Sequence, residues 1–343
     1  MKIRVLLYVA VALIIAMIVY VDHELDKQIT VPAEGRIFRI ESGSSVRSVI
    51  AKLATSGIIE TSPIVTRAYG LANRFMGTIK TGEYRLTPNM SLRDVLALFR
   101  SGKVAQRQIT FVEGWRFSQW REHLGNKEHV KQTLDRESDF AIMKLLGNDG
   151  VHPEGQFFPD TYHFPAGETD LSILRRAHKR MQRILQTEWQ RRSAGNLLES
   201  SYEALILASI IEKETGYQPD RPRIARVFIN RLEQNMRLQS DPTVIYGLSE
   251  RFDGDLLRVH LKDDSPYNTY RHRGLPPTPI SNPGRPAIRA VMQPAAGDHL
   301  YFVAKGDGTS HFSSTLAEHN EAVTRYQKSG RVENYRSVPG VEQ

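Results

Sequence analysis

The sequence contains no cysteine, which excludes disulfide bonds, thiolate nucleophiles and cysteine-ligated zinc or iron–sulfur sites. Its histidines do not form an HExxH or a comparable metal-binding spacing. There is no P-loop, and no GxGxxG follows a candidate strand. No repeat of fixed period and no long low-complexity tract is present. We therefore expect no metal and no cofactor, and any chemistry should come from acid, base and hydroxyl side chains.

The chain also lacks a dense run of one charge. Its 343 residues carry a net charge of +8, but Lys and Arg are spread along the sequence. A basic balance suits nucleic acid, anionic lipid or an acidic polymer equally well, so a nucleic-acid partner gains little support. Hydrophobic residues make up 40% and charged residues 24%, which is typical of a globular protein with a real core.

The N-terminus contains the long apolar run of the sequence, Val5–Val21, which has seventeen residues without a charge. That length is near the lower limit for a helix that spans a membrane. Lys2 and Arg4 precede it, which predicts a cytoplasmic tail at residues 1–4 and an extracytoplasmic remainder. The alternative is a cleaved signal peptide, but its small-x-small pattern at 10–12 comes too early. We favour an uncleaved anchor in the inner (plasma) membrane.

Beyond the anchor, the pattern predicts an α+β protein with two parts. Residues 22–35 are polar and contain Pro32 and Gly35, which indicates a linker. Residues 36–105 follow the order strand, helix, helix, strand, helix, with the second helix after Pro63 and a Ser91 cap on the last. Residues 106–343 form the larger part, which we expect to be a mixed α+β catalytic domain. A long basic amphipathic helix is expected at 171–192, and a β-hairpin around 306–308.

The most informative segment is a helix that is apolar on every side and then ends in two glutamates. From Ala204 to Ile211 only Ser209 is polar, which predicts a buried helix. Glu212 and Glu214 follow, and Gly216 ends the helix. Burial and the negative end of the helix dipole both disfavour ionised carboxylates, so either side chain is a candidate general acid.

The two glutamates are not equivalent, because residues two apart on a helix point about 160° away from each other. Glu214 lies over Ile210 and Ile211, larger apolar neighbours than those of Glu212, which favours Glu214 modestly as the acid. The alternative is that both are exposed at a fraying helix end, with one paired to Arg221 or Arg223.

Polar and aromatic residues on rigid Pro/Gly loops follow this helix. Such groups suit the hydroxyls and amides of a carbohydrate, although ordinary turn chemistry explains them as well. Asp241 before Pro242 can equally cap a helix that begins there. The candidate substrate-binding residues are Glu212, Gln239, Asp241, Tyr267, Asn268, Tyr270 and Asn282.

Seven segments together resemble the YceG-like family of endolytic murein transglycosylases. In chain order they are EGQFFPDTY (154–162), ASIIEKET (208–215), VFINRL (227–232), RLQSDPTVIYG (237–247), SPYNTY (265–270), GLPPTPISNPG (274–284) and YFVAKGDGTSHF (301–312). The resemblance covers most of residues 150–320. It implies that Glu214, the second glutamate of EKET, is the essential acid. It also implies that residues 36–105 form a LysM-like glycan-binding module.

The resemblance further implies the reaction: cleavage of the MurNAc–GlcNAc bond in nascent peptidoglycan, with 1,6-anhydro ends and termination of strand growth. Hydrolases commonly need two carboxylates, whereas this sequence offers one well-motivated acid and no clear partner for it. The implied partners are peptidoglycan strands and, beside them, the synthases. The competing hypothesis is a non-catalytic, membrane-tethered peptidoglycan-binding protein.

Overall fold

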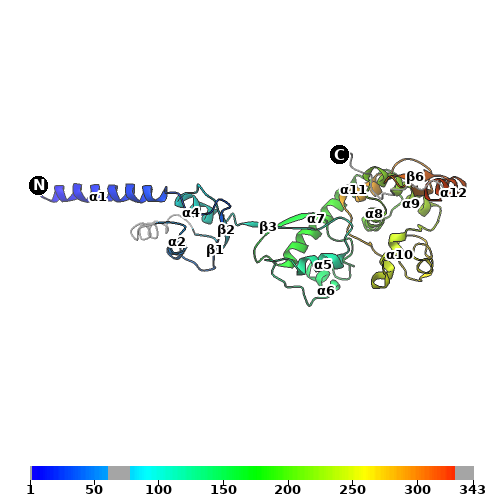
Figure 1. Cartoon of the computed structure of the whole chain (residues 1–343), viewed down its shortest axis with the longest axis horizontal. Coiled ribbons are helices and arrows are strands. Elements are labelled where there is room, and N and C mark those ends of the chain that lie inside the picture. Colours follow the sequence, from blue (N-terminus) through cyan, green and yellow to red (C-terminus); the bar gives the residue numbers. More distant parts are fainter. Residues whose placement is uncertain (1, 61–77, 329–343) are drawn as a thin grey trace. The chain divides into compact units, whose positions relative to one another are not determined.

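The computed structural model describes residues 2–60 and 78–328 (Figure 1). The chain forms two compact units, one comprising residues 1–108 with 163–168 and the other residues 109–162 with 169–343. Both contain helices and short two-stranded sheets, so the expected α+β class is confirmed. The helix expected after Pro63 lies outside the described residues.

The first unit begins with α1 (Lys2–Leu25), whose apolar side chains are exposed along most of its length. The helix is long and apolar enough to cross a membrane, a property it shares with signal sequences. It extends beyond the predicted apolar run into the segment expected to be a linker. Leu25 and Ile29 of that segment are buried in the core of the unit, and the Ile29 N–H donates to the Met90 carbonyl (2.8 Å).

The rest of the first unit is a small α+β core. Strand β1 (Arg36–Ile40) pairs antiparallel with β2 (Gly82–Leu86), and helices α2 (Val46–Thr55) and α4 (Leu92–Ser101) also belong to it. Ser91 caps α4, as the sequence predicts, and the structure adds a capping box with Asp94. The core residues alternate along the strands or recur at helical spacing; they include Phe38, Ile50, Leu53, Tyr84, Leu96 and Phe99.

The second unit is mostly helical. Its strands β5 (Tyr301–Ala304) and β6 (Ser310–Ser313) form the predicted hairpin. A further two-stranded sheet pairs β3 (Gln106–Thr110) with β4 (Thr161–Pro165), strands whose residues are divided between the two units. The helices are α5 (Phe117–Gly125), α6 (Asp139–Leu145), α7 (Asp170–Gln190), α8 (Ser201–Glu214), α9 (Arg221–Glu233), α10 (Asp241–Leu248), α11 (Arg285–Met292) and α12 (Leu316–Val323).

Helix α8 lies at the centre of this unit. Every residue from Ala204 to Ile211 is buried, which confirms the prediction from its all-round apolar pattern. α8 packs against α7, α9, α10 and α11 (Figure 1). Because four helices surround it, its C-terminal end and the two glutamates there are held in a fixed position.

Candidate active site

Glu214 is the last residue of α8 and is partly exposed. The helix ends there because Thr215 is extended, so its last residue lies two positions before Gly216, the expected stop. The Ser240 hydroxyl donates a hydrogen bond to Oε1 of Glu214. Burial raises the pKa of Glu214 to about 7, with the Asp241 charge adding to the rise, while the Ser240 hydrogen bond and the Arg231 charge oppose it. A large share of this carboxyl group is therefore protonated at neutral pH.

Two threonines hold Ser240 in place. The Ser240 N–H donates to Oγ1 of Thr269 (3.0 Å), and the Thr243 hydroxyl donates to the Ser240 carbonyl (2.6 Å). The two threonine hydroxyls also lie 2.8 Å apart. Gln239 precedes Ser240 with an exposed side chain and a φ of 52°, a left-handed conformation that is uncommon outside glycine. The loop thus fixes the hydroxyl that contacts the carboxyl group of Glu214.

Asp241 and Tyr270 lie beside this contact. Asp241 is exposed at the start of α10, and its Oδ1 accepts a hydrogen bond from the Tyr270 hydroxyl (2.6 Å). Arg231 of α9 donates to the carbonyls of Leu238 (2.8 Å) and Leu300 (2.7 Å). Its buried guanidinium therefore braces the start of the loop and places a positive charge near Glu214.

Glu212 meets different partners. It forms an ion pair with Arg221 (2.8 Å), and both side chains are only 5% exposed. Its Oε2 also accepts the Gly284 N–H (2.9 Å). Burial raises the pKa of Glu212, and the Arg221 charge opposes that rise. The pairing with Arg221 that the sequence left open is therefore present, but it is a buried contact rather than one at a frayed helix end.

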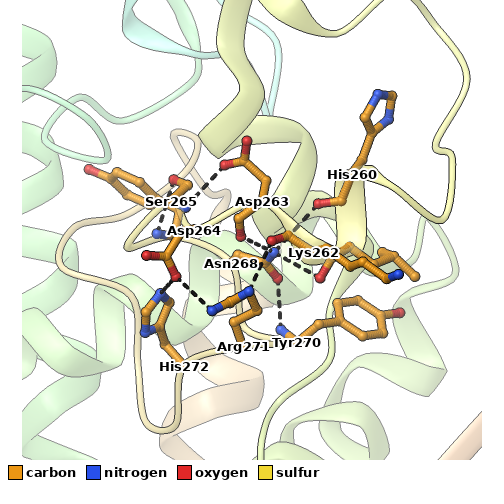
Figure 2. A network of polar contacts seen from close by, with 11 residues as sticks. His260, Lys262, Asp263, Asp264, Ser265, Asn268, Tyr270, Arg271 and His272 are labelled. Atoms are coloured by element: carbon orange, nitrogen blue, oxygen red, sulfur yellow. Dashed lines mark hydrogen bonds and ion pairs between the residues drawn. The ribbon is translucent and has the colours of Figure 1, made fainter.

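Asn268 lies at the centre of a network of contacts with its own loop (Figure 2). Its side-chain amide donates to the carbonyls of Asp263 (2.7 Å) and Leu261 (3.1 Å), and its Oδ1 accepts the Tyr270 N–H (3.0 Å). Asn268 is fully buried, so these bonds replace the regular backbone pairing that the loop lacks. Tyr267 lies nearby in sequence, and its hydroxyl is 2.8 Å from that of Thr278.

Asn282 has the same kind of bonding as Asn268. Its Oδ1 accepts the Phe157 N–H (3.0 Å), and its amide donates to the Trp115 carbonyl (3.0 Å) and to Glu154 (3.3 Å). Glu154, a buried acid that the sequence analysis missed, also accepts the Phe117 N–H (3.0 Å). Burial raises its pKa to about 7. Glu154 is only 4% exposed, whereas Glu214 keeps an exposed surface, and this difference separates the two acids.

The candidate residues thus fall into two groups. Around Glu214 the structure brings together Asp241 and Tyr270, and it adds Ser240 and Arg231, which were not selected from the sequence. Gln239 directly precedes Ser240, and its side chain is exposed. The sequence carries no signal for Ser240, since its contact with Glu214 spans 26 residues.

The second group has its polar atoms engaged by other protein groups: Glu212, Tyr267, Asn268 and Asn282. Within residues 2–60 and 78–328, no three histidine or carboxylate side chains lie close enough together to hold a metal ion.

Comparison with known proteins agrees with the sequence motifs. A family model described as the YceG-like family matches residues 38–325. An endolytic murein transglycosylase of Bacillus subtilis (strain 168) is 34% identical over 310 residues, which cover 84% of each protein. One from Streptococcus pneumoniae serotype 2 (strain D39) is 26% identical over 90% of this chain and 62% of that relative. The crystal structure of a YceG-like protein from Listeria monocytogenes has a TM-score of 0.53 and 30% identity, covering 84% of this chain and 99% of that one.

The fold and the site define an α+β protein in which a buried central helix brings one protonatable carboxyl group to a partly exposed position. The chain belongs to the YceG-like family, as its motifs indicated.

Proposed function

We propose that this chain is an endolytic murein transglycosylase with Glu214 as its catalytic acid and base. The observation that carries the proposal is the Glu214 carboxyl group, which burial holds at a pKa of about 7 in a partly exposed position. A general acid works best when its pKa lies near the working pH. The relatives named endolytic murein transglycosylase supply the substrate class, and family membership makes the chain an enzyme of the lytic transglycosylase type.

The proposed reaction uses one carboxyl group twice. Protonated Glu214 gives its proton to the glycosidic oxygen as the bond between that oxygen and C1 of N-acetylmuramic acid breaks. The ionised carboxylate then takes the proton of the muramyl 6-hydroxyl while that oxygen bonds to C1 and closes a 1,6-anhydro ring. The acid is regenerated without water, and intramolecular attack gains a large effective molarity.

Two measurements test the proposal. Digestion of glycan strands in heavy-oxygen water should give anhydro ends without label, whereas labelled reducing ends as the main product would indicate a hydrolase. Glu214→Gln should keep the fold and lose most turnover, because an amide cannot transfer the proton. Glu233→Gln, at an exposed glutamate of α9, is the matched control and should keep turnover. A Glu214→Gln chain with near wild-type activity contradicts the assignment, and a wild-type chain that binds strands without cutting them supports the non-catalytic alternative.

The anchor and the first unit complete the proposal. α1 would hold the protein in the plasma membrane with a cytoplasmic N-terminus, so that the catalytic unit meets nascent strands and their synthases. Residues 36–105 would act as the LysM-like module and bind glycan. Removing them should weaken binding to long strands but leave the kind of product unchanged. Equal affinity with and without these residues would contradict this role.

A further inference from the structure

A cavity of about 490 Å³ lies in the second unit and is lined by two cations, Arg116 and Lys213. Pro242 and Ile245 of α10 form part of its wall. Lys213 directly precedes Glu214, and Pro242 directly follows Asp241. The cavity is therefore bounded by residues that adjoin Glu214 and Asp241 in the chain.

The two cations have no carboxylate within ion-pair distance among the residues that the structure describes. The Arg116 guanidinium donates to the Ile245 carbonyl (3.2 Å) and lies 4.9 Å from the centre of the Tyr246 ring. The Lys213 ammonium donates to the Gly114 carbonyl (3.4 Å). These contacts fix the side chains in place but leave both positive charges without a counter-ion.

Nearby acids compensate these charges only in part. The Glu212 charge opposes the lowering of the pKa of Lys213, but Glu212 is already paired with Arg221. Glu154 lies near Arg116, but burial raises its pKa to about 7, so a large share of it is protonated at neutral pH and more of it at lower pH. Burial lowers the pKa of Lys213, and the Arg116 charge lowers it further, as expected for two cations that share a partly enclosed space.

The N-terminus of α5 adds to the positive character of the cavity. Arg116 is the N-cap residue of this nine-residue helix, and Ser118 and Gln119 of its first turn also line the cavity. The positive end of a helix dipole favours an anion in such a position. A guanidinium offers planar, paired donors that match a carboxylate, and an ammonium adds a point charge.

We propose that this cavity binds a carboxylate of the glycan substrate and so positions the strand across Glu214. The inference rests on the proposed function and identifies the part of the substrate that the cavity recognises. The anionic groups along a murein strand are carboxylates. They have two sources: the lactyl carboxylate of a muramyl residue without a peptide, and the free carboxylates of a peptide stem.

The test measures binding rather than cleavage. The full chain carrying Glu214→Gln is titrated with peptide-free and with peptide-bearing strands, each untreated and after amidation of its carboxylates. Adding Lys213→Gln should weaken binding of untreated strands about tenfold, the effect of one lost charge-assisted hydrogen bond. Amidation should weaken binding by a similar factor, and Lys213→Gln should then have no further effect. Lys179→Gln, at an exposed lysine of α7, is the matched control.

The pattern of losses assigns the carboxylate. A loss on peptide-free strands identifies the lactyl group, and a loss confined to peptide-bearing strands identifies the stem. Arg116→Gln should show the same dependence on amidation, with thermal unfolding as a check on its fold. Equal losses on untreated and amidated strands, or no loss on either, would overturn the proposal. Because binding is read in a chain without turnover, this outcome is distinct from failure of the proposed reaction, which product analysis reports.

Discussion

The hydrogen bond from Ser240 to Glu214 predicts a specific change in the pH dependence of the enzyme. The bond stabilises the ionised carboxylate and therefore lowers the pKa of Glu214, against the rise caused by burial. The first step of the proposed reaction needs the protonated acid. kcat/KM should therefore be level below the pKa of Glu214, about 7, and fall about tenfold per pH unit above it.

The pH at which kcat/KM begins to fall is the bend of the profile. Ser240→Ala should move this bend to higher pH. A hydrogen bond to a charged group contributes about 1.5–3 kcal/mol, and one pKa unit corresponds to about 1.4 kcal/mol. Loss of the bond thus predicts a shift of about one to two pH units, with the lower end expected where water takes the place of the hydroxyl. The rate below the bend should also fall, because Glu214 loses the group that orients it.

Asp241→Asn gives a matched change of opposite sign. The negative charge of Asp241 raises the pKa of Glu214, so its removal should move the bend to lower pH. The asparagine oxygen can still accept the hydrogen bond of the Tyr270 hydroxyl. Initial rates of anhydro-end formation, measured below KM across about pH 5 to 9, give the three bends. An unmoved bend in Ser240→Ala, or shifts of the same sign in both variants, would refute the reasoning.

Three further outcomes are expected. Arg221→Ala should lower the free energy of unfolding by about 3–5 kcal/mol at neutral pH, because it leaves Glu212 buried without a cation. The loss of stability in Arg221→Ala, measured by denaturant titration, should become smaller as the pH falls and Glu212 takes up a proton. Asn282→Ala should cost about 1–3 kcal/mol in the same assay, since it leaves the Phe157 N–H unpaired, while the Trp115 carbonyl keeps its bond from the backbone N–H of residue 282. N-terminal sequencing from membrane fractions should recover the chain with Val5–Val21 attached; a mature start after residue 20 contradicts the anchor.

Much of the fold could be predicted because it depends on local patterns. The segment 204–211 is apolar apart from Ser209, and such a run indicates a buried element. Ser91 lies three residues before Asp94, which is the spacing of a capping box. The hairpin at 301–313 follows from alternating residues around a Gly-Asp-Gly turn.

The site was less predictable because it depends on contacts between distant segments. Ser240 lies in a loop whose sequence resembles a helix cap. Its position in the sequence gives no indication that its side chain contacts Glu214. Asn268 and Asn282 have side chains suited to carbohydrate, yet in the structure those side chains bond to loop backbone and, for Asn282, to Glu154. A loop rich in proline has too few regular backbone partners, and asparagine amides supply them. Composition alone cannot separate these two uses of the same side chain.

The continuation of α1 beyond its apolar run determines how the first unit would stand on a membrane. The helix reaches Leu25, whose side chain is part of the core of that unit. Arg93 of α4 pairs with Asp22 in the last turn of α1 (2.5 Å) and with Asp26 just after it (2.7 Å). With α1 in a bilayer, this unit would be joined to the membrane by a rigid helix rather than by a flexible linker. Its height and its orientation to the lipid surface would then be set by the helix, and a strand bound to it would leave the membrane along one preferred direction.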